Sequence, residues 1–128
     1  MKLNVLLSIS AVYLALVGLA FLFIPSAIMF GTLDPGAPAA LLASLRVVAG
    51  AFIGAAVLNW LAREVEPSKA RDAVVLANTV GFALAGILDV VAVTGGAPAM
   101  ELAPAAINLA FAATFLWLGQ ASMSTAKG

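Results

Sequence analysis

The sequence contains no cysteine and no histidine among its 128 residues. These absences exclude a thiol-based disulfide or quinone oxidoreductase, a metal cluster held by cysteines and a haem held by histidine. The side chain most often used for proton transfer near neutral pH is missing as well. Enzymes that depend on any of these groups are therefore ruled out.

Charged residues are also scarce, at 9%, whereas 64% of the residues are hydrophobic. A soluble domain carries about 25% charged residues, so this chain has too few polar groups to cover a surface in water. The six basic and six acidic residues balance, and no net field attracts nucleic acid. The mean hydropathy of +1.15 indicates a protein of the lipid bilayer.

Four apolar runs are long enough to cross the hydrocarbon core, which takes about 20 helical residues. They cover Leu3–Ile24, Ala39–Ala62, Ala73–Thr94 and Leu102–Ala121, with turn-forming residues between them. The first run is longer than the apolar stretch of a signal peptide, about 7–15 residues, so we expect a retained helix. The sequence predicts an all-α fold, in which four transmembrane helices form an antiparallel bundle and one domain over residues 1–128.

The basic residues outside these runs predict the orientation of the bundle. All of them fall on one side of a four-span arrangement: Lys2, Arg63, Lys69, Arg71 and Lys127. The other side carries Asp34 and Glu101. The positive-inside rule therefore places both termini in the cytoplasm. We expect the membrane to be the prokaryotic cytoplasmic (inner) membrane. Trp60 and Trp117 lie near the cytoplasmic ends of two runs, where we expect them to be interfacial anchors.

Two charges lie inside the apolar runs, where a charge costs roughly 2.5–3.5 kcal/mol on insertion scales. Arg46 in the second run and Asp89 in the third both fall roughly 8–10 Å below the outer boundary. Consecutive spans with a short connection are normally neighbours. We therefore expect Arg46 and Asp89 to pair, and Asn108, at a similar depth in the fourth run, to complete a polar cluster.

Small and polar residues recur every three or four positions in the second and third runs. Gly50 and Gly54 follow Arg46 as a GxxxG pattern, and the third run carries Asn78, Gly81, Ala85 and Asp89 at this spacing. Small residues let helices approach closely, and polar residues bond across the contact. We expect the two stripes to be packing surfaces that face each other. Asn59 lies about 220° around the helix from Arg46 and is expected to face another helix or the inner interface.

The Arg46–Asp89 pair has a structural and a functional interpretation. As a bridge that specifies the fold, it would leave an unpaired charge when one partner is removed, at a cost of roughly 3–5 kcal/mol. As part of a polar pocket with Asn108, open to the outside, it would bind a ligand or pass an ion.

A few short motifs carry a resemblance to a known family. Phe23-Ile24-Pro25 closes the first run, Leu45-Arg46 is followed by two glycines in the second, and Gly95-Gly96 follows the third. In these residues and in its layout, the whole chain resembles small prokaryotic four-helix integral membrane proteins of unknown function, loosely akin to DoxX-like proteins. The resemblance implies the fold and no activity. Asp89 is not part of that pattern.

Three classes of function compete. The first is a non-catalytic accessory or assembly subunit of a larger membrane complex, in contact with the lipid bilayer and with other membrane subunits or further copies of itself. The second is a binder or conduit for a small lipophilic or ionic ligand at Arg46, Asp89 and Asn108. An enzyme is the third and the least favoured, because no nucleophile has a general base nearby. The sequence indicates no catalytic residue and no metal site, and it leaves pigment or quinone cofactors open.

Overall fold

The computed structural model describes residues 1–25 and 36–125 of the chain, with side chains described as far as residue 121. Asp34 and Lys127, which entered the prediction of orientation, lie outside these residues. The described chain is helical: α1 (Leu3–Phe23), α3 (Ala39–Ala62), α4 (Lys69–Thr94), the short 3-10 helix η1 (Ala99–Glu101) and α5 (Leu102–Thr125). Four of these helices are long and apolar enough to cross a membrane, as the sequence predicted.

Helix α4 begins four residues before the apolar run that predicted it. Ser68 caps its first turn, because the side-chain oxygen accepts a hydrogen bond from the backbone N–H of Arg71 at 3.3 Å. Asp72 lies in the same turn, where a carboxylate interacts favourably with the helix dipole. The helix thus extends beyond the apolar run at this end, because the polar residues before Ala73 are also helical.

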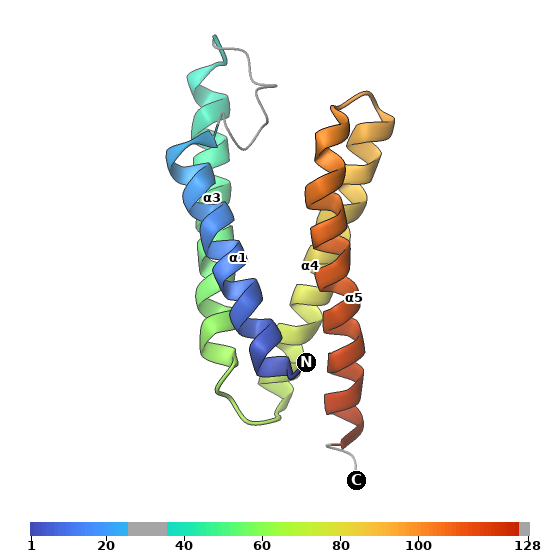
Figure 1. Cartoon of the computed structure of the whole chain (residues 1–128). Helices are drawn as coiled ribbons and strands as arrows, with labels where there is room; N and C mark the ends of the chain where they lie inside the picture. The colour runs from blue at the N-terminus through green and yellow to red at the C-terminus, as the bar shows by residue number, and fades with distance from the viewer. Residues whose placement is uncertain (26–35, 126–128) are drawn as a thin grey trace. The chain divides into compact units, whose positions relative to one another are not determined.

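The chain divides into two compact units, one of residues 7–61 and one of residues 1–6 with the rest of the chain from residue 62. The first contains most of α1 together with α3, and Figure 1 shows these two helices side by side and running in opposite directions. The second contains α4, η1 and α5, and α4 and α5 are likewise antiparallel neighbours (Figure 1). We call α1 with α3 the α1–α3 hairpin, and α4 with η1 and α5 the α4–α5 hairpin.

The α1–α3 hairpin is closed by a glycine and an aromatic pair. A methyl group placed on Gly18 of α1 would lie 2.8 Å from Ile53 Cγ1 and 3.2 Å from the Ala49 carbonyl oxygen of α3. The missing side chain thus allows the helices to approach closely. About one turn further along α1, the Phe21 ring stacks on the Phe52 ring of α3, with centroids 5.6 Å apart.

A glycine and stacked aromatic rings also lie at the contact between α4 and α5. A methyl group on Gly86 would lie 2.6 Å from Leu109 Cγ. Phe82 stacks on Phe111 and Phe115, with ring centroids 4.7 and 6.0 Å apart. The turn after α4 uses Gly96 at φ 104°, a backbone conformation that residues with a side chain rarely adopt.

Candidate functional site

The polar contact that joins α4 to α5 lies within the apolar spans. Asn108 Nδ2 donates a hydrogen bond to Asp89 Oδ2 at 3.1 Å. Asp89 is five residues from the end of α4 and Asn108 six from the start of α5, so both lie about 8–9 Å along the helix axes from the turn that joins α4 to α5. Asn108 is only 9% exposed, whereas Asp89 is half-buried. The buried amide therefore orients a carboxylate that stays accessible.

The rest of the α4–α5 hairpin supplies no positive charge to this carboxylate. Its basic residues among those described, Lys69 and Arg71, lie at the opposite end of α4, about 27–30 Å away along the helix axis. Asp89 Oδ1 accepts no hydrogen bond from any residue in the described part of the chain. A carboxylate inside a membrane span usually pairs with a cationic group, because the hydrocarbon region does not solvate charge.

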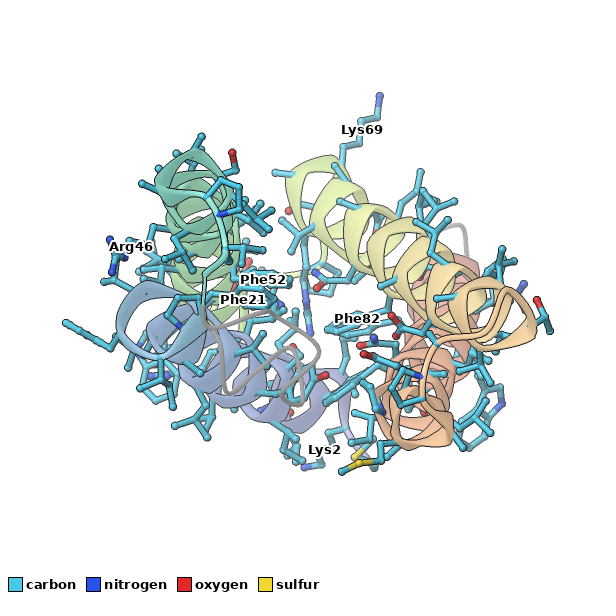
Figure 2. The ribbon with its side chains drawn as sticks, turned by 90° about the horizontal axis from the view of Figure 1, so that it is seen from above. Lys2, Phe21, Arg46, Phe52, Lys69 and Phe82 are labelled. Carbon is cyan, nitrogen blue, oxygen red and sulfur yellow. The ribbon has the colours of Figure 1, made fainter. Side chains whose placement is uncertain are left out.

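Arg46 belongs to the other hairpin, where it is exposed on α3. Figure 2 shows its side chain pointing outward from α3, away from Phe52. Among the described residues of the α1–α3 hairpin, none forms a hydrogen bond or an ion pair with its guanidinium group. The structure thus brings together two members of the predicted cluster, Asp89 and Asn108, and the pairing of Arg46 with Asp89 stays a prediction.

The glycines of the two predicted packing stripes are open on their own hairpins. A methyl group on Gly50, Gly54 or Gly81 would meet no atom within 4 Å. In the α4 stripe, Ala85 is half-buried and the Asn78 side chain donates to the Val74 carbonyl at 2.8 Å. The contact between α1 and α3 uses a different side of α3. That the two stripes face each other stays a prediction.

A second buried polar contact joins α1 to α3. Asn59 Nδ2 donates to Ser10 Oγ at 3.0 Å, and Ser10 Oγ donates to the Leu7 carbonyl at 3.0 Å. Both side chains are fully buried. The expectation that Asn59 faces another helix is confirmed. Ser10 was missed, although an asparagine in an apolar span needs a partner and the preceding span offered this hydroxyl.

Two hydroxyl groups, those of Ser44 and Thr94, are bonded to the backbone of their own helices. Ser44 Oγ donates to the Ala40 carbonyl at 2.9 Å, and Thr94 Oγ1 donates to the Val91 carbonyl at 2.8 Å. Such bonds satisfy a hydroxyl group within a span. In the described ranges, no three His, Cys, Asp or Glu side chains gather as metal ligands.

The tryptophans predicted to anchor the protein are both exposed on their helices. Trp60 lies two residues from the end of α3 and is 48% exposed, and Trp117 on α5 is 68% exposed. An exposed indole near the end of a span suits the boundary between lipid and water. Their anchoring role stays a prediction.

Comparisons with protein-family models, with curated proteins and with solved structures found no match. The site must therefore be interpreted from its own residues. Three features carry that interpretation: the oriented carboxylate of Asp89, the charge of Arg46, which has no partner among the described residues of its hairpin, and the exposed glycines on α3 and α4.

Proposed function

We propose that this chain is a multi-pass protein of the prokaryotic cytoplasmic membrane that serves as a non-catalytic accessory or assembly subunit. One observation carries the proposal: an arginine and two glycines lie on an open side of α3, inside an apolar span. Glycine lets helices approach closely, and a charge in a span requires a partner. Such a side of a helix suits contact with another membrane helix. The resemblance to small four-helix membrane proteins, loosely akin to DoxX-like proteins, agrees with this fold and implies no activity.

Membrane insertion is supported by the side chains on the helix surfaces. At most 33% of the residues in any of the four candidate spans are buried within the chain. Large apolar side chains stay exposed all along the helices, including Leu16, Val47, Leu76 and Leu116. Lipid tails cover such surfaces, whereas water would drive them to aggregate.

The proposed orientation can be checked with introduced cysteines, because the chain has none of its own. We expect Ser68→Cys, between α3 and α4, to react with a membrane-impermeant maleimide only after the cells are permeabilised, which gives the reagent access to the cytoplasmic side. Gly95→Cys, between α4 and α5, should react in intact cells. The reverse pattern would show that the positive-inside rule fails for this chain.

Native mass spectrometry after gentle extraction from native membranes tests the accessory role. We expect the chain to migrate in a larger species that contains at least one other protein, since its exposed charged side would be covered there. Recovery of the chain only as a monomer or as a small assembly of identical copies would contradict a role in a larger complex. Arg46→Leu, which removes the charge from α3 and keeps an apolar side chain, should weaken the contacts that α3 makes within that species.

The second candidate function is a ligand site at Asp89 and Asn108, and the 3.1 Å contact between them favours it. A carboxylate held by a buried amide, with one oxygen left open, can bind a cationic group or a proton. Binding of a small cation that disappears in Asp89→Asn and persists in Glu101→Gln would support this function. Binding unchanged in Asp89→Asn would contradict it.

A further inference from the structure

The contact with α1 leaves one charged side of α3 open. Arg46, Gly50 and Gly54 lie about 120° around the helix from the side that packs on Gly18. The guanidinium group offers five N–H donors, and none has a partner in the described part of the α1–α3 hairpin. We call Arg46, Gly50 and Gly54 the Arg46 face.

The α4–α5 hairpin has a corresponding open side on α4. Asp89, Ala85 and Gly81 lie along it, about 80° around the helix from the side that packs on α5. A methyl group on Gly81 would meet no atom within 4 Å, and Asp89 Oδ1 accepts no hydrogen bond from the described residues of this hairpin. We call Asp89, Ala85 and Gly81 the Asp89 face.

The two faces are complementary in charge and in spacing. In the Arg46 face, two glycines come after the arginine at steps of four positions. In the Asp89 face, an alanine and a glycine come before the aspartate at the same steps. When α3 and α4 run in opposite directions, the arginine meets the aspartate, and the two pairs of small residues lie level with each other. Arg46 and Asp89 are also at similar depths below the outer ends of their helices.

We propose that the partner of these faces is a second copy of this chain, with the Arg46 face of each copy on the Asp89 face of the other. The inference rests on the proposed membrane insertion. Two copies with the same orientation, related by a twofold axis along the membrane normal, present α3 of one antiparallel to α4 of the other and form two equal contacts. Pairing α3 with α3 would instead bring two Arg46 side chains together, where like charges repel in a medium that screens them poorly.

Charge exchange between copies tests the proposal. Arg46→Asp and Asp89→Arg, each expressed alone, place like charges in both contacts, and we expect the dimer fraction to fall at least about tenfold. Expressed together with different affinity tags, the two variants restore opposite charges in both contacts of a mixed dimer. Native mass spectrometry should then recover mixed dimers at the wild-type level and few dimers of either variant alone.

Disulfide cross-linking provides an independent measurement. Ala43→Cys lies one turn outward from Arg46, and Ala92→Cys lies one turn outward from Asp89, both at exposed positions. Oxidation of membranes that contain the two single-cysteine variants with different tags should join them into a mixed dimer. The matched control is Leu41→Cys, 41% exposed and about 160° around α3 from Ala43, which should not join to Ala92→Cys.

Two results would overturn the proposal. One is the absence of mixed dimers on co-expression while the double variant Arg46→Asp/Asp89→Arg behaves as wild type, which would place the pair within one chain. The other is equal cross-linking of the Leu41→Cys control. Extraction with alkaline carbonate distinguishes a failure of the second-copy contact from a failure of membrane insertion, on which the proposed function depends. A chain that stays in the membrane pellet without mixed dimers contradicts the second-copy contact alone, and a chain released from the pellet contradicts membrane insertion.

Discussion

Asp89→Leu is expected to lower the free energy of unfolding by about 3–5 kcal/mol, and Arg46→Leu by a similar amount. If Arg46 and Asp89 are partners, as we propose, each single replacement leaves the opposite charge unpaired inside an apolar span. The double replacement Arg46→Leu/Asp89→Leu removes both charges and should cost less than either single change. Unfolding of the full chain in mild detergent at a fixed protein concentration measures all three variants.

The double variant decides whether the two charges are partners. If its loss of stability equals the sum of the two single losses, Arg46 and Asp89 act independently, and both the bridge and the second-copy contact are contradicted. Glu66→Gln is the matched control, because this exposed carboxylate lies in the loop between α3 and α4. It should change stability by less than about 0.5 kcal/mol.

Gly86→Leu is expected to force α4 and α5 apart and to lower the free energy of unfolding by about 1–3 kcal/mol. Even the first added carbon would lie 2.6 Å from Leu109 Cγ and 3.1 Å from the Ala105 carbonyl oxygen. The Leu109 side chain can shift, but the Ala105 carbonyl oxygen moves only with the backbone of α5. Thermal unfolding of the full chain in detergent measures the effect.

Gly81→Leu, on the same helix, is the matched control for this steric effect. An added side chain there meets no atom within 4 Å of its first carbon. At protein concentrations where the chain is monomeric, we expect its stability to stay at or slightly above the wild-type value, because leucine favours the helix more than glycine does. Equal losses in Gly81→Leu and Gly86→Leu would show that the close approach of α4 and α5 does not limit the side chain at Gly86.

Much of the interior of each hairpin could not be predicted, and the glycines show why. Gly50 and Gly54 formed the most recognisable packing motif, yet α1 packs on the side of α3 that carries Phe52 and Ile53. Gly86, which no motif singled out, makes the close contact with α5. In a soluble helix the apolar side indicates the core, but in a membrane span nearly every side is apolar. Hydrophobic periodicity then carries little information about which side meets a neighbour.

The polar residues were better guides than the glycines. An asparagine or aspartate inside an apolar span is costly unless it is bonded, so its presence alone predicts a contact between helices. This reasoning anticipated a helix partner for Asn59 and a shared site for Asp89 and Asn108, and the structure has both contacts. It did not identify Ser10, because a hydroxyl group in a helix can also bond to its own backbone.

The sequence by itself determined that this protein has four long apolar helices and approximately where each begins and ends. Backbone groups in lipid must bond within their own segment, so length and hydropathy are sufficient to predict a span. Only the tertiary structure decided that Ser10 is the partner of Asn59 and that Gly18 and Gly86 set the distances between the helices of each hairpin. These contacts depend on steric fit between particular side chains of distant segments, which composition and periodicity do not encode.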